Sequence, residues 1–189
     1  MKIKNLGIAA GLAAALVAAH GASATTFTFT GLGSVPASGY STTVDGITVT
    51  VTAPGEDLGY LNLDGIGVYT GFGNLDGIQN NETLLVTFSQ QVIVNDLHMR
   101  QWELADQIII DPNTGAPITY TAESGAFDTN EHINLTGLGG LNSFTIEGDS
   151  IGTVTLLASL NVTAVPEPTT AALLLCGLAG LARAGRRRG

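Results

Sequence analysis

Hydrophobic and polar residues alternate with a period of two through the middle of the chain. The segments TFTFT at 26–30, ITVTVT at 47–52 and SFTIE at 143–147 place β-branched or aromatic residues at every second position, as half-buried strands require. Turn-forming clusters of Gly, Asn, Asp or Ser separate these and further strand-like segments at 83–88, 91–102, 107–110, 118–121 and 152–163. About eight short strands without helical patterns between them predict an all-β fold, an antiparallel β-sandwich of jelly-roll type.

The N-terminus has a different pattern, with one unbroken apolar run. Lys2 and Lys4 precede an apolar stretch at 6–19, and the small residues Ala-Ser-Ala follow at 22–24. This order is typical of a helical secretory signal peptide, and the run is shorter than the roughly 20 residues that span a bilayer. We expect cleavage after Ala24, which makes Thr25 the first mature residue. The alternative is a permanent N-terminal anchor.

The C-terminus, residues 165–189, carries a second apolar run. Pro166, Glu167 and Pro168 lead into AALLLCGLAGLA at 171–182, and the prolines keep their own segment extended. The run predicts a short transmembrane helix, of about 25 Å when it is counted from 169 to 185. An amphipathic or buried helix is the alternative. Cations after the run halt translocation and leave the C-terminus inside; they are Arg183, Arg186, Arg187 and Arg188.

The order Pro-Glu-Pro, apolar helix and arginine cluster resembles the PEP-CTERM sorting signal of Gram-negative bacteria. The resemblance implies that an exosortase-type processing enzyme recognises 166–168 and that the arginine cluster acts as the stop-transfer signal. It further implies the secretion machinery, a signal peptidase and, transiently, the inner membrane as partners. The expected destination is the cell surface, or a biofilm's extracellular matrix with its polysaccharide.

Charge separates the chain into the same three parts: 1–24, a domain at 25–164, and 165–189. The domain holds fifteen of the 16 acidic residues and one of the seven basic residues, Arg100, which gives it a formal charge of −14. Such a surface repels phosphate backbones and argues against nucleic-acid binding. The only cysteine, Cys176, lies in the tail, so a disulfide within the domain is excluded.

Acidic residues accompany a long Gly- and Asn-rich segment at 54–81, which we expect to be a loop. Calcium takes six to eight oxygen ligands from carboxylates and carbonyls, and such loops supply both. The candidate ligands are Asp57, Asp64, Asp76 and Glu82. The alternative is that these carboxylates cap turns and keep the surface soluble.

A second candidate site lies on the predicted strand at 91–102. His98, Arg100 and Trp102 share one face if no bulge interrupts the period of two. An aromatic ring beside hydrogen-bonding side chains can bind a sugar. In the alternative, Trp102 packs at a sheet margin and Arg100 pairs with Glu103 or Asp106.

Motifs of catalysis are missing from the sequence of the domain. It has no His-x-His, His-Glu-x-x-His, Gly-x-Ser-x-Gly or phosphate-binding loop pattern. We therefore expect an exported protein without enzymatic activity and with a structural or adhesive role in the cell envelope or extracellular matrix. The alternative is a lectin-like carbohydrate-binding module, with calcium as a candidate ion. A glycosidase or lyase is the remaining enzyme hypothesis.

Overall fold

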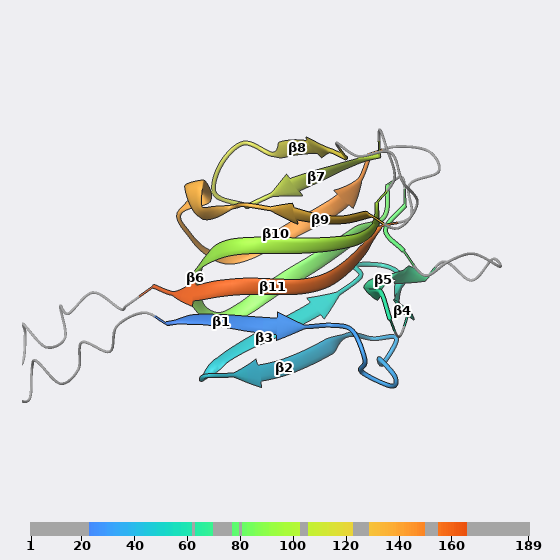
Figure 1. Ribbon diagram of the computed structural model, residues 1–189, viewed down its shortest axis with the longest axis horizontal. Helices are drawn as coiled ribbons and strands as arrows, with labels where there is room; N and C mark the ends of the chain where they lie inside the picture. The colour runs from blue at the N-terminus through green and yellow to red at the C-terminus, as the bar shows by residue number, and fades with distance from the viewer. Residues whose placement is uncertain are drawn as a thin grey trace, which may run out of the picture. The chain divides into compact units, whose positions relative to one another are not determined.

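The computed structural model describes residues 23–61, 63–69, 77–79, 81–102, 106–122, 129–149 and 155–165. They belong to one compact unit, Ser23–Val165 (Figure 1). The described part has 11 strands and a single 3-10 turn, which confirms the all-β prediction. In chain order the elements are β1 (Ala24–Thr28), β2 (Tyr40–Val44), β3 (Ile47–Thr52), β4 (Asp57–Leu61), β5 (Gly65–Tyr69), β6 (Thr83–Trp102), β7 (Gln107–Asp111), β8 (Ile118–Thr121), β9 (Thr129–Ile133), η1 (Thr136–Leu138), β10 (Gly140–Gly148) and β11 (Leu156–Ala164).

All the strand pairs are antiparallel and belong to one continuous sheet with the order β4-β5-β11-β6-β10-β7-β8. In addition, β1 pairs with β11, β2 with β3, and both β3 and β9 with β6. The antiparallel arrangement agrees with the alternation of buried and exposed residues in the sequence.

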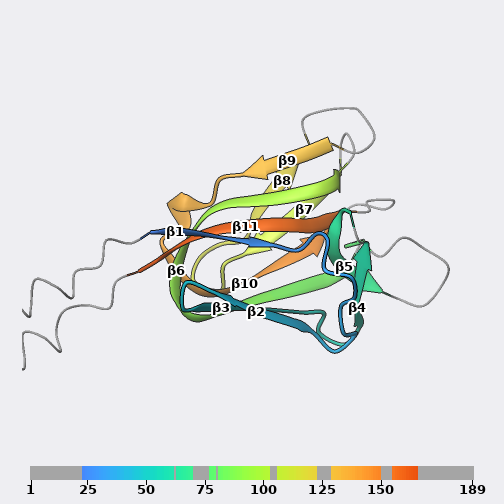
Figure 2. The same cartoon turned by 60° about the horizontal axis from the view of Figure 1, so that its bottom comes forward.

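The 20-residue strand β6 connects the two halves of this sheet. Its first part pairs with β3 through 85–88 and with β10 through 83–87, and β10 continues beyond a register shift to pair with 92–93. Its second part pairs with β11 through 92–100 and with β9 through 97–102. Figures 1 and 2 show β6 bending between these two sets of partners.

One hydrophobic core receives side chains from both halves of the sheet. Phe27 of β1, Val49 of β3, Val86 of β6, Phe144 of β10 and Leu160 of β11 all have 0% exposure. Burial of a side chain of this size stabilises the fold by about 1.5–3 kcal/mol. The period-two positions of the segments at 26–30, 47–52 and 143–147 therefore mark the inward faces of β1, β3 and β10.

The segment expected to be a loop, 54–81, instead contains the hairpin of β4 and β5. The prediction was wrong there because β5 is buried along most of its length and does not alternate. Gly65 shows why glycine is needed: its φ is +133°, and a Cβ added there would lie 2.2 Å from the carbonyl oxygen of Leu157 in β11. Gly65 thus permits a close approach of two backbones, whereas in the sequence this glycine suggested a turn.

The first and last strands of the described domain lie side by side. β1 pairs with β11 from Ala24 opposite Thr163 to Thr28 opposite Ser159. Just after β11, the amide of Val165 donates a hydrogen bond to the carbonyl of Gln91 at 2.9 Å. Chain entry and chain exit are therefore neighbouring positions at one end of this strand pair (Figure 1).

Neither predicted terminal helix can be compared with the structure. The signal segment at 1–22 and the apolar tail at 171–182 lie outside the described residues. Within the ranges that are described, no helix has the length and apolar character needed to cross a bilayer.

Candidate functional site

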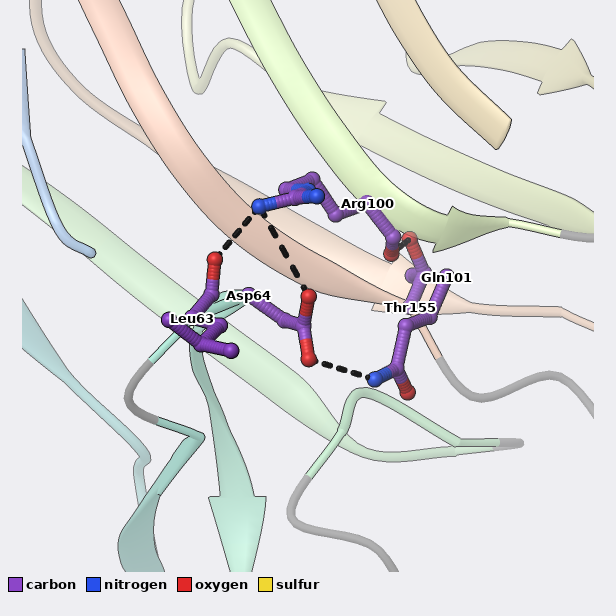
Figure 3. Close-up of polar contacts among 5 residues, drawn as sticks. All are labelled: Leu63, Asp64, Arg100, Gln101 and Thr155. Atoms are coloured by element: carbon purple, nitrogen blue, oxygen red, sulfur yellow. Dashed lines mark hydrogen bonds and ion pairs between the residues drawn. The ribbon is translucent and has the colours of Figure 1, made fainter. Parts of the chain in front are cut away.

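The structure brings together Asp64, a predicted calcium ligand, and Arg100, a residue of the predicted sugar-binding strand. Arg100 of β6 places Nη1 3.6 Å from Oδ1 of Asp64, in the β4–β5 turn. The same nitrogen donates a hydrogen bond to the carbonyl of Leu63, and Gln101 Nε2 donates to Asp64 Oδ2 at 2.8 Å (Figure 3). The side chains of Arg100 and Asp64 are 25% and 21% exposed. We call Leu63, Asp64, Arg100 and Gln101 the Arg100 cluster.

A β-bulge gives the Arg100 cluster its geometry. Gln101 has a φ of +55°, and the register of β6 against β9 shifts between Met99 and Trp102. Thr155 Oγ1 donates to the carbonyl of Arg100 at 3.3 Å on the same stretch (Figure 3). The bulge interrupts the alternation that was needed to place Trp102 on the same face as His98 and Arg100.

The three predicted calcium ligands that the structure describes have separate environments. Asp57 is exposed on β4 opposite Tyr69, and Asp64 belongs to the Arg100 cluster. Glu82 Oε2 accepts a hydrogen bond from the amide of Gln79 at 2.7 Å, which is the turn-capping contact of the alternative interpretation. Asp76 lies outside the described residues. Among the residues that are described, no three His, Cys, Asp or Glu side chains gather to hold a metal.

The predicted signal cleavage point lies at the start of β1. Ala24 is exposed and pairs with Thr163, whereas Thr25 is 3% exposed and its Oγ1 donates to Asp45 Oδ2 at 3.1 Å. Cleavage after Ala24 would thus remove one residue from the β1 ladder. A peptidase needs this bond extended and accessible, so we expect cleavage before β1 pairs with β11. The sorting motif and arginine cluster, Pro166, Glu167, Pro168, Arg183, Arg186, Arg187 and Arg188, lie outside the described residues.

The sequence patterns did not reveal a second polar cluster, which lies across four neighbouring strands. Asn161 of β11 is opposite Thr26 of β1 on one side and Asp96 of β6 on the other. One row further, Ser159 is opposite His98, and His98 is opposite His132 of β9. We call this set the amide–imidazole face; its members are Thr26, Asn95, Asp96, His98, His132, Ser159, Asn161 and Thr163.

Hydrogen bonds orient the amides of the amide–imidazole face. Asn95 Nδ2 donates to Asn161 Oδ1 and to Thr163 Oγ1, each at 2.8 Å. Asn161 Nδ2 in turn donates to Thr26 Oγ1 at 2.9 Å. The chain of contacts fixes which end of each amide is oxygen and which is nitrogen. It therefore holds the donors and acceptors of three strands in one arrangement.

The two histidines form a parallel stack at one side of the face. The ring centroids of His98 and His132 are 4.3 Å apart, with 6° between the ring planes. His132 Nδ1 lies 2.8 Å from Asp96 Oδ2, so a neutral His132 carries its proton on Nδ1 and leaves Nε2 as an acceptor. Parallel stacked rings direct their nitrogen lone pairs within parallel planes. These lone pairs therefore do not converge on one point, as those of metal ligands do.

No protein-family model matches the chain, and no curated protein shows significant similarity to it. The Arg100 cluster joins segments of the fold through a half-buried ion pair, whereas the amide–imidazole face presents oriented polar groups at the surface.

Proposed function

We propose that this chain is an exported precursor whose domain at 25–164 reaches the cell envelope or the extracellular polysaccharide matrix. Its role there is structural or adhesive and not catalytic. An exosortase-type enzyme processes the tail at the sorting motif, 166–168, after the inner membrane has held it transiently. The observation that supports this proposal best is the pairing of β1 with β11.

That pairing lets both ends of the domain be processed without loss of its core. The described core side chains extend from Phe27 to Val162, inside the predicted cleavage after Ala24 and the tail from 165. A cut at either end removes at most the end of the β1–β11 ladder. A domain of this kind can be attached to a surface by one end while its fold stays complete.

The proposal includes a sandwich arrangement of the domain. β3 pairs with the first part of β6, whereas β11 and β9 pair with the second part, and all three strands contribute to one core. A bent strand shared by two facing layers accounts for both facts, because each layer then buries one face and leaves the other to solvent.

The proposal is tested by cell fractionation in a Gram-negative host that carries an exosortase-type enzyme. The full chain should be found in the envelope or matrix, and a chain lacking 166–189 should move to the periplasm or medium with an unchanged thermal melt. Glu167→Ala should leave uncut precursor in the inner membrane, and Thr169→Ala, two residues away, is the matched control. An unaltered distribution of the deletion variant would overturn the proposal.

A second candidate function, carbohydrate binding, is favoured by the amide–imidazole face. This face shares only His98 with the platform expected from the sequence. The adhesive role and the carbohydrate-binding role differ in whether the domain itself recognises a sugar.

A further inference from the structure

We propose that the amide–imidazole face binds a neutral polysaccharide through hydrogen bonds to its hydroxyl groups. The inference deepens the proposed adhesive role and rests on it, because it names the surface and the chemical class of the partner. Four observations support it: the position of the face, its preorganised amides, the bulge that builds it, and the charge of the domain.

The face is broad, accessible and formed by adjacent strands. Thr26 is exposed and Asn161 is half-buried, and the side chains of His132 and Asp96 are 60% and 34% exposed. The pairing register places them in two rows across β1, β11, β6 and β9, strands that Figures 1 and 2 show side by side. With strands about 4.8 Å apart, such rows extend over more than one sugar ring.

The amides of the face are oriented before any ligand arrives. Asn95 donates to both Asn161 and Thr163, and Asn161 donates to Thr26. Both protons of Asn95 Nδ2 are used in these contacts, whereas the Asn95 carbonyl oxygen, one lone pair of Asn161 Oδ1 and one proton of Asn161 Nδ2 retain hydrogen-bonding capacity. Because these side chains are already held in place, they lose less conformational entropy when a ligand binds.

A second β-bulge builds the face. In the register of β6 against β11, Asp96 is opposite Asn161 while Val94 is opposite Val162, so Asn95 is the extra residue. Both Asn95 and Asp96 contact partners on the same face, namely Asn161 and His132. Regular alternation would place one of these two neighbouring residues in the core. Bulges often re-aim a side chain at functional sites, and here the bulge adds a polar group to the surface.

The chemistry of the face suits hydroxyl groups, which donate and accept hydrogen bonds at once. Asn161 supplies a donor and an acceptor, the side-chain oxygens of Asn95 and Asp96 supply acceptors, and a neutral His132 supplies an acceptor at Nε2. The parallel imidazole rings of His98 and His132 add planar side chains to one side of the face. The parallel rings do not converge on a metal ion, so a metal-dependent mode is not part of the inference.

The charge of the domain selects neutral polymers over anionic ones. The domain carries a formal charge of −14, and its single basic residue, Arg100, is engaged by Asp64. A polyanion would approach this surface against repulsion and without an available arginine. A neutral glycan has no such cost.

The test is isothermal titration of the full chain, purified in mild detergent, with four neutral hexasaccharides: maltohexaose, cellohexaose, xylohexaose and mannohexaose. We expect at least one to bind and an alginate hexamer not to bind. Asn161→Ala and His132→Ala should each weaken the binding about 10-fold, because each removes hydrogen-bonding groups from the face. His132→Gln retains polar atoms at the position and should restore part of the affinity.

Thr43→Ala is the matched control. Thr43 of β2 forms an exposed 2.7 Å hydrogen bond with Thr48 of β3, so its loss also removes a surface polar contact but lies outside the face. Thermal melts show which variants fold. Binding to none of the neutral sugars, or binding that the face variants leave unchanged, overturns the inference. The sorting experiment above is independent, so failure here leaves the proposed export and adhesive role standing.

Discussion

Two polar clusters depend on β6, and they differ in what their side chains contact. The Arg100 cluster joins β6 to the β4–β5 turn through an ion pair whose side chains are 25% and 21% exposed. The amide–imidazole face connects β1, β11, β6 and β9 at the surface, where the side chain of His132 is 60% exposed. Each cluster lies at a register shift of β6. The same backbone irregularity thus serves a structural contact in one place and an open polar surface in the other.

The comparison predicts that changes near the Arg100 cluster alter stability, whereas changes on the amide–imidazole face alter ligand binding.

The largest effect on stability is expected at Gly65, beside Asp64. Gly65→Ala places a Cβ 2.2 Å from the carbonyl oxygen of Leu157, so β5 or β11 must shift, and we expect a loss of at least about 3 kcal/mol in the free energy of unfolding. Urea denaturation measures it. Gly137→Ala, with open space around the added carbon, is the control and should change stability by less than about 1 kcal/mol.

The ion pair itself should contribute less. Asp64→Ala leaves the Arg100 guanidinium half-buried beside the Leu63 carbonyl, and we expect a loss of about 1–2 kcal/mol after allowance for partial exposure. Arg100→Met removes the charge together with its need for a partner. In a double-mutant cycle, the two substitutions should be non-additive by about 1 kcal/mol; additive effects would show that the two side chains do not cooperate.

On the amide–imidazole face, Asn95→Ala should cost about 1 kcal/mol or less, because Asn161 and Thr163 lose a donor at a half-exposed position and water can replace it. The same variant should weaken binding of the neutral hexasaccharide by severalfold. If Asn95→Ala instead unfolded the domain and left the sugar affinity of the folded fraction unchanged, the face would be a structural contact and not a binding surface.

Calcium gives a smaller and more specific expectation. Asp64 is already paired with Arg100, so Asp64→Asn should not change any shift in melting temperature that calcium or a chelator produces. Thermal melts of both proteins, with calcium and with chelator, measure the difference. A calcium-dependent shift that disappears in Asp64→Asn would place the ion at this carboxylate and contradict its assignment to the ion pair.

The smallest effect concerns Tyr120 of β8, whose pKa is raised by burial. Because the folded state holds this proton more tightly than the unfolded state does, the stability it contributes decreases as the pH rises above about 10. Tyr120→Phe should flatten that part of the stability profile, as measured by urea midpoints between about pH 9 and pH 11. A decline of the same steepness in the variant would assign it to other tyrosines.

The sequence predicted strands with a clear period-two pattern, such as β3, and missed β2, β4, β5 and β9. ITVTVT at 47–52 is buried at every second residue, as expected, whereas β5 is buried at four successive residues and its glycines suggested a loop. Pairing between distant segments carries no local signal. The contact of Arg100 with Asp64 and the stack of His98 on His132 therefore could not be read from the chain.

The candidate surface was only partly visible for the same reason. His98 was identified from the polar positions of its strand, but a bulge has no reliable sequence pattern. One bulge separates Arg100 from Trp102, and another adds Asn95 to the face. Asn161 and Thr163 alternate as outward residues do, yet only the register of β11 against β6 brings them to Asn95.

The most direct test of the whole account is the intact mass of the protein recovered from the cell surface. The account predicts a chain that begins at Thr25, ends at or near the sorting motif at 166–168, and lacks the apolar run at 171–182. Recovery of the unprocessed chain, from Met1 to Gly189, in the cytosol and without a shorter form at the surface would contradict it.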